Sequence, residues 1–253
     1  MKMMKKFLAF FLAMIMLLSF AGCGKTMCSV EGCENEAVED TTYEESLCDK
    51  HLTGKKAFDA SKIAYDSIDV AYEITEQYGS DVYEAWRMGI YDKDEILDDD
   101  VAYLASELSL SEEDIKLGVA YTVSELMGQD WETLTEESKK AYCAEADLYF
   151  YLMEDDLFTF CVMVVSNAYK VNGKVDEAKT ALDEAKAQMK ELSDKYSDYE
   201  HYPNLKGYYT TTSSFFDFCQ NPTGSFEQVK DTINDYKNEA RDYISDLDYI
   251  FEE

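Results

Sequence analysis

Apolar residues recur at intervals of three and four along most of the chain after residue 55, which is the period of an amphipathic helix. The rhythm is clearest over residues 57–78, 175–196, 205–219 and 226–250. Alternation with a period of two, the sign of a half-buried strand, is hard to find. The pattern therefore predicts an all-α fold, an antiparallel helical bundle over residues 55–253, in which 55–130 and 134–253 are an optional subdivision.

The expected helix ends follow from glycines and capping residues. Gly79 is expected to stop the first helix of the bundle, and Asp81 to cap a short helix after it. Ser111 caps a later helix, and Ser225 with Gln228 forms a capping box at the start of the last one.

Residues 136–171 have the length and pattern of one longer helix, whose middle is apolar on all sides. The three consecutive carboxylates at residues 154–156 favour a solvated edge or a break within it.

The first 22 residues do not share this pattern. Three lysines within the first six residues are followed by an uncharged apolar stretch at residues 7–20. This order is that of a signal peptide, and 14 apolar residues are too few for a comfortable membrane span. Residues 1–22 are therefore predicted to be a signal peptide.

The stretch Phe20-Ala21-Gly22-Cys23 resembles the lipobox of bacterial lipoproteins, which prefers Leu where this chain has Phe20. The resemblance implies that the Cys23 thiol takes a diacylglycerol and that the peptide is cut before it. Residues 23–27 would then be a lipidated N-terminus, anchored at the outer face of the cytoplasmic membrane. Two acyl chains suffice for stable attachment. An ordinary secretory signal with a chance cysteine at the cut is the alternative.

Three cysteines and a histidine follow at once: Cys28, Cys33, Cys48 and His51, spaced C-x4-C-x14-C-x2-H. Zinc takes four such ligands in a tetrahedron, commonly as two close pairs brought together by a loop. Residues 28–52 are therefore predicted to bind about one zinc per chain. A disulfide is the alternative, since it is the usual pairing outside the cell.

The stretch "CSVEGCENEA...LCDKH" also resembles the short Cys3His zinc knuckles, in which Gly32 and Ala37 match beside the four ligands. The resemblance implies a structural zinc and a role in interaction rather than catalysis. The remaining cysteines, Cys143, Cys161 and Cys219, fall at apolar helical positions and are expected to act as small buried hydrophobes.

Composition narrows the class of partner. The formal net charge is −30, and removal of residues 1–22 takes away three lysines and no carboxylate, which leaves −33. Such a surface repels nucleic acid, so no nucleic-acid partner is expected. A hydrophobic content of 46% is too high for a disordered chain.

Catalytic motifs are hard to find. The chain has two histidines, and His201 has no nucleophile motif around it. Gly24-Lys25-Thr26 is not the end of a phosphate-binding loop, because Ser19 stands where that loop needs glycine. An enzyme is therefore not expected. A cell-envelope enzyme using carboxylates and a solute-binding receptor component remain as alternatives.

Tyrosine is abundant, with 20 residues, and it is enriched at protein interfaces. Tyr202, Tyr208 and Tyr209 form a candidate interaction face for a surface protein or glycan. A tyrosine-rich core is the alternative, and the regular helical seams are also compatible with a homodimer.

Residues 79–96 and 221–253 resemble helical lipoproteins of unassigned function in clostridia-like bacteria. Together these features predict a lipid-anchored extracytoplasmic lipoprotein that acts as a binding module, with a structural zinc.

Overall fold

The computed structural model of the chain describes residues 25–251. The predicted signal peptide and the predicted lipidation site at Cys23 lie outside these residues. The chain divides into two compact units, one ending at Lys56 and the other beginning at Ala57. Residues 25–251 contain nine α-helices and no strand, apart from an isolated antiparallel bridge between Met27 and Glu36. The predicted all-α class is therefore confirmed.

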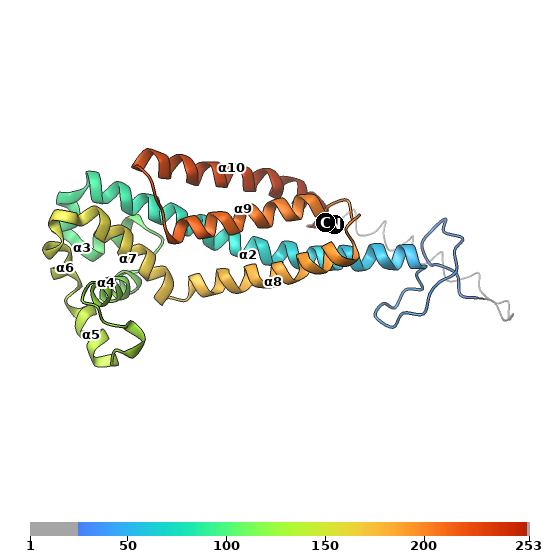
Figure 1. Cartoon of the computed structure of the whole chain (residues 1–253), viewed down its shortest axis with the longest axis horizontal. Coiled ribbons are helices and arrows are strands. Elements are labelled where there is room, and N and C mark those ends of the chain that lie inside the picture. Colours follow the sequence, from blue (N-terminus) through green and yellow to red (C-terminus); the bar gives the residue numbers. More distant parts are fainter. Residues whose placement is uncertain (1–24, 252–253) are drawn as a thin grey trace, which may run out of the picture. The chain divides into compact units, whose positions relative to one another are not determined.

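The elements follow one another through short connections (Figure 1). They are α2 (Asp49–Tyr91), α3 (Lys93–Glu107), α4 (Glu112–Leu126), η1 (Trp131–Thr133), α5 (Glu136–Ala144), α6 (Ala146–Leu152), η2 (Glu154–Asp156), α7 (Leu157–Val171), α8 (Lys174–Lys195), α9 (Tyr202–Gln220) and α10 (Phe226–Phe251). None of these helices combines the length and hydrophobicity that crossing a bilayer requires.

Helix α2 is continuous over 43 residues, so the predicted stop at Gly79 is wrong. Gly79 is instead a point of close approach to α9, because a Cβ atom there would lie 2.6 Å from Cζ of Phe215. Asp81 does not cap a helix, since it lies inside α2 and its side chain is buried. The glycine was misinterpreted because a turn and a tight helix contact both require a missing side chain.

The stretch expected to form one long helix is divided into α5, α6 and α7. The backbone leaves the helical region at Glu145 (φ −107°, ψ 15°) and at Met153 (φ −100°, ψ 17°). The three carboxylates that follow Met153 form the short 3-10 turn η2. Helix α5 buries none of its residues, whereas α7 is largely buried. The bends allow the apolar stretch of α7 to enter the core while the more polar α5 stays at the surface.

Helix α7 is the central helix of its region, as its uniformly apolar sequence predicts. It packs most closely on α4, where Gly118 faces Val164 and Ala168. A Cβ atom at Gly118 would lie 2.9 Å from Cβ and 3.0 Å from the backbone nitrogen of Ala168, and closer still to the carbonyl oxygen of Val164. The two helix backbones are thus in near contact.

Helix α10 runs antiparallel to the part of α2 that belongs to the bundle. The Phe58 and Phe251 rings are 5.5 Å apart at one end, and the Tyr83 and Phe226 rings are 5.2 Å apart at the other. Helices α8, α9 and α10 run alongside this part of α2 (Figure 1). The arrangement agrees with the antiparallel bundle that the periodicity predicts.

Two predicted helix starts are confirmed by their hydrogen bonds. The Asp114 amide donates to the Ser111 hydroxyl, and the Ser111 amide donates to the Asp114 carboxylate at 3.0 Å. At the start of α10, the Ser225 amide donates to Oε1 of Gln228 at 2.8 Å.

Candidate metal centre

Cys28 and Cys33 lie on one tight loop near the start of the described chain. The loop is closed by hydrogen bonds from the Cys28 amide to the Asn35 carbonyl at 3.0 Å and from the Cys33 amide to the Val30 carbonyl at 3.0 Å. Gly32 has a φ of +76°, a conformation that glycine adopts without strain. The loop places both thiols within one group of candidate ligands.

Cys48 and His51 lie at the start of α2. Cys48 directly precedes the helix and His51 is in its first turn, so a spacing of three places both side chains on one face. The backbone amides of His51 and Lys50 donate hydrogen bonds to the Cys48 sulfur. They hold the pKa of Cys48 below its usual value. A helix N-terminus thus favours the thiolate that a metal requires.

The two pairs meet in one cluster. Nδ1 of His51 lies 3.2 Å from Sγ of Cys28 and 3.4 Å from Sγ of Cys48. The sulfurs of Cys33 and Cys48 are 3.7 Å apart, and all four candidate ligand atoms lie within 4.8 Å of one another. The four residues predicted from their spacing therefore form one group that can hold a metal ion.

The three thiols are free rather than paired, as are the other cysteines within residues 25–251. The sulfur separation between Cys33 and Cys48 is far above the ~2.05 Å of a disulfide. The pKa of Cys33 is lowered by the Asn35 amide, but burial and the neighbouring thiols of Cys48 and Cys28 outweigh this and raise it overall. Three sulfurs this close together repel one another when all are ionised to thiolates, and a bound cation offsets that repulsion.

The segment around the cluster has a very small apolar core. Its buried side chains are Cys28, Leu47, Cys48 and Leu52, with Tyr43 packed against them. Two of these four residues, Cys28 and Cys48, are candidate metal ligands. Units shorter than about 40 residues rarely fold on such burial alone and use metals or disulfides instead. The size of this core therefore makes the cluster the main cross-link available to the segment.

The other cysteines have different surroundings. Cys161 and Cys219 are buried in the bundle, as predicted, and burial raises the pKa of Cys161 to about 12. Burial also raises the pKa of Cys219. Cys143 is only half-buried. Within residues 25–251, the cysteine and histidine cluster is the single group of three or more side chains suited to hold a metal ion.

The proposed tyrosine face is not supported by burial. Tyr208 is fully buried, and its hydroxyl donates to Oδ1 of Asp69 at 3.0 Å. Tyr202 and Tyr209 are half-buried and pack against the core. Periodicity contained the correct signal, because Tyr208 stands three residues after Leu205 and seven before Phe215, on the apolar stripe of α9. Tyr208 belongs to the core, as the alternative of a tyrosine-rich core predicts.

A buried polar cluster around Asp81 was missed. The Asp81 carboxylate accepts hydrogen bonds from the hydroxyl of Tyr169 at 2.8 Å, from the Ser109 amide at 3.2 Å and from Gln77 at 3.2 Å. The Ser109 hydroxyl also donates to it. Asp81 stands three residues after Tyr78 and four before Ala85, both fully buried, and this helical spacing is the sequence signal that places it on the core side of α2.

Comparisons with protein-family models, curated proteins and solved structures found no match for this chain. Its function must therefore be argued from its own residues.

Proposed function

We propose that the chain is an extracytoplasmic lipoprotein, anchored through Cys23, in which a zinc ion folds the segment that follows the anchor. The zinc is held by Cys28, Cys33, Cys48 and His51. The helical bundle then acts as a binding module for a protein at the cell surface. The observation that carries the proposal is the convergence of three thiols and one imidazole in a segment with almost no other core.

The distances within the cluster support zinc. With Zn–S bonds of about 2.3 Å and a Zn–N bond of about 2.0 Å, two sulfurs of a tetrahedral site lie about 3.8 Å apart and a sulfur and a nitrogen about 3.5 Å apart. The cluster has 3.7 Å between the sulfurs of Cys33 and Cys48, and 3.4 Å between Sγ of Cys48 and Nδ1 of His51. Soft thiolate ligands also favour zinc over calcium or magnesium.

The role of the zinc is structural rather than catalytic. Four protein ligands complete the coordination sphere, whereas a catalytic zinc keeps one position open for water or substrate. Because 14 residues separate the loop ligand Cys33 from Cys48 at the helix start, the ion would add a cross-link between two pieces of chain that are otherwise joined by backbone hydrogen bonds, such as that from the Ser29 amide to the Ser46 carbonyl.

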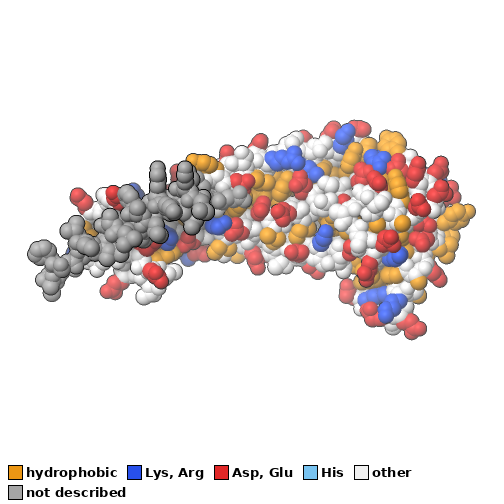
Figure 2. Space-filling view, turned by 180° about the vertical axis from the view of Figure 1, so that it is seen from behind, with side chains coloured by type: hydrophobic (Ala, Val, Ile, Leu, Met, Phe, Trp, Pro, Cys, Tyr) orange, Lys and Arg blue, Asp and Glu red, His pale blue; other side chains and the backbone are white. Residues whose placement is uncertain are grey.

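The membrane anchor is supported by the lipobox-like residues 20–23. Four residues separate Cys23 from Cys28, so the zinc-binding segment would lie next to the acyl chains. The acidic side chains are spread over the visible face of the bundle (Figure 2), and like charge repels anionic lipid headgroups. In this proposal only the acyl chains hold the protein to the membrane.

Helix α6 supports a binding role for the bundle. Leu148, Tyr151 and Leu152 are 51%, 65% and 63% exposed, and their spacing places them on one face of the helix. Exposed carboxylates precede and follow them in sequence, at Asp147 and at residues 154–156. An apolar patch with an acidic rim fits a protein partner whose contact surface is apolar with a basic rim.

Metal analysis tests the zinc. The full chain, purified without chelator, should contain about one zinc per chain. Cys48→Ser should lose most of it, whereas Cys143→Ser, which removes a thiol outside the cluster, should retain it. A metal-free protein with oxidised cysteines would reject the zinc site.

Metabolic labelling tests the anchor independently. Cells fed an azide-tagged fatty acid should label the parent chain, and Cys23→Ser should abolish both the label and membrane retention. Unlabelled parent protein with an intact N-terminus would contradict the lipoprotein assignment, whatever the metal content.

A further inference from the structure

A cavity of about 380 Å³ lies between α2, the junction of α3 with α4, and α10. This is within the range of about 300–1,000 Å³ that small-molecule sites occupy. Its lining carries carboxylates, lysines and neutral polar groups. The distribution of these charges indicates what the cavity can bind.

One side of the cavity is acidic. Asp81 is only 3% exposed, and its hydrogen-bond donors, from Ser109, Tyr169 and Gln77, are all uncharged. No ion pair within residues 25–251 includes Asp81. Glu107, at the end of α3, and Glu84, on α2, are the other two carboxylates of the lining, and Glu84 already pairs with Arg87 at 2.6 Å. Buried carboxylates are most stable beside a positive charge, so this side favours a ligand ammonium group.

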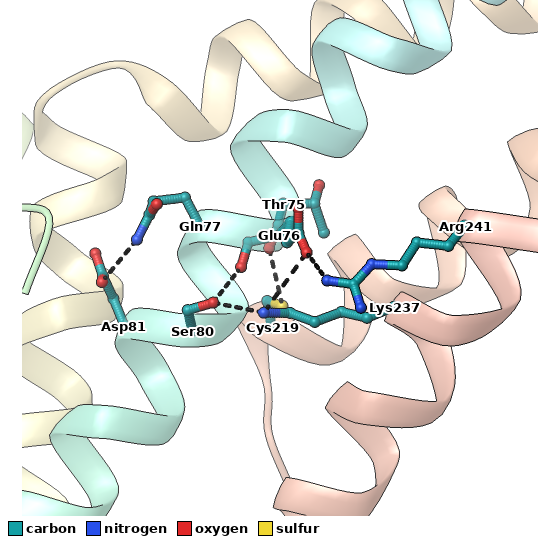
Figure 3. A network of polar contacts seen from close by, with 8 residues as sticks. All are labelled: Thr75, Glu76, Gln77, Ser80, Asp81, Cys219, Lys237 and Arg241. Carbon is teal, nitrogen blue, oxygen red and sulfur yellow. Dashed lines mark hydrogen bonds and ion pairs between the residues drawn. The ribbon is translucent and has the colours of Figure 1, made fainter. Parts of the chain in front are cut away.

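The opposite side is formed by α10 and is basic. Lys237 reaches from α10 to α2, where its Nζ donates to the Ser80 hydroxyl at 2.7 Å (Figure 3). The same Nζ lies 3.8 Å from Oε1 of Glu76, which also pairs with Arg241 at 3.2 Å. Lys237 is thus held in place and already has a carboxylate partner.

Lys230 lies two turns before Lys237 on α10 and also lines the cavity. Among the residues that the structure describes, no carboxylate pairs with it, in contrast to Lys237. Asn234 follows it by one turn and adds an amide donor to the same lining. This pair can receive a carboxylate, by a charge-assisted hydrogen bond from Lys230 and a neutral one from Asn234.

We propose that this cavity binds a small zwitterionic solute, an amino acid or a short peptide. Its ammonium group faces Asp81 and Glu107, and its carboxylate faces Lys230 and Asn234. A ligand with one charge satisfies only one side of the cavity. The proposal goes beyond the function proposed above, because no residue of the cavity belongs to the metal centre or to the anchor.

Calorimetric titration of the full, zinc-loaded chain tests the proposal. The probes are the twenty common L-amino acids and a set of dipeptides. At least one should bind with a Kd below about 1 mM. Its N-acetylated and C-amidated analogues, each of which lacks one charge, should bind about tenfold more weakly or worse. If none of the probes binds, or if either analogue binds as tightly as its parent, the proposal is overturned.

Two variants locate the site. Lys230→Gln and Glu107→Gln should each raise the Kd about tenfold, while Lys179→Gln, an exposed lysine of α8 with no place in the cavity, should leave it unchanged. Thermal unfolding of each variant checks that the fold is retained. Binding that survives both cavity substitutions would assign the ligand elsewhere and reject this site. Zinc content and acylation should be the same in all three variants, so a failure here is distinct from a failure of the proposed function.

Discussion

Replacement of Gly118 by alanine measures how closely α4 and α7 pack. The added Cβ would lie 2.9 Å from Cβ and 3.0 Å from the nitrogen of Ala168, and against the Val164 carbonyl. Because carbon atoms pack at about 3.5–4.0 Å, the helices must separate by about 0.5–1 Å. A gap of that size removes about a quarter to a half of the dispersion energy at each contact that it opens.

The expected magnitude follows from two opposing effects. Overpacking of a core costs about 1–3 kcal/mol, and two of the atoms in the way here belong to a helix backbone that cannot rotate aside. Alanine recovers about 1 kcal/mol of helix propensity relative to glycine. Because these backbone atoms place the overpacking cost near the upper end of its range, about 3 kcal/mol, we expect Gly118→Ala to lower the free energy of unfolding by about 2 kcal/mol. Urea denaturation monitored through far-ultraviolet circular dichroism measures this.

Gly54→Ala, in the unit that ends at Lys56, is the control for the change from glycine to alanine alone, because Gly54 is also helical but a Cβ added to it would have no atom within 4 Å. It should leave stability unchanged or raise it by up to about 1 kcal/mol. If Gly118→Ala proves at least as stable as the parent, α4 and α7 do not approach as closely as described, and the account of the central helix is wrong.

Three further predictions test other parts of the molecule. Removal of metal with a chelator should make residues 25–56 sensitive to protease while the helical signal of the bundle persists, and equal protection with and without metal would contradict a structural role. Burial and neighbouring aspartates, Asp147 first among them, raise the pKa of Asp100 to about 6. The native state therefore binds more protons than the unfolded state between about pH 4 and 6, so stability falls as pH rises through this window. Asp100→Asn should stabilise the protein at pH 7 by on the order of 1 kcal/mol, after allowance for partial exposure, and urea titrations at pH 4 and 7 check this. Tyr208→Phe should cost about 1 kcal/mol through loss of the hydrogen bond to Asp69, and an unchanged urea midpoint would show that this bond contributes nothing.

The candidate metal centre was predictable because it depends on residues close together in sequence. The spacing of Cys28, Cys33, Cys48 and His51, with Gly32 at the turn, identifies two ligand pairs without knowledge of the rest of the fold. Helix class and the capping residues at Ser111 and Ser225 were predictable for the same reason, since they depend on neighbours within four residues.

The errors concern contacts between residues far apart in sequence. Gly79 looks like a helix stop until Phe215, 136 residues later, is found against it. Asp81 looks like a cap until its donors from α7 and from the loop after α3 are known. The cavity was missed for the same reason, because its two charged sides come from helices more than 100 residues apart.

The close contacts at Gly79 and Gly118 have a consequence for tracing the ancestry of this chain. Surface residues of a strongly acidic bundle can be substituted freely, so the sequence identity between distant relatives falls to a level that comparisons do not detect. Where a helix has no room for a side chain, the glycine can be replaced by a larger residue only if the neighbouring helix moves as well. Small residues at the equivalents of these two sites, each in mid-helix and far from any turn, should therefore outlast most of the sequence and serve as markers for distant relatives.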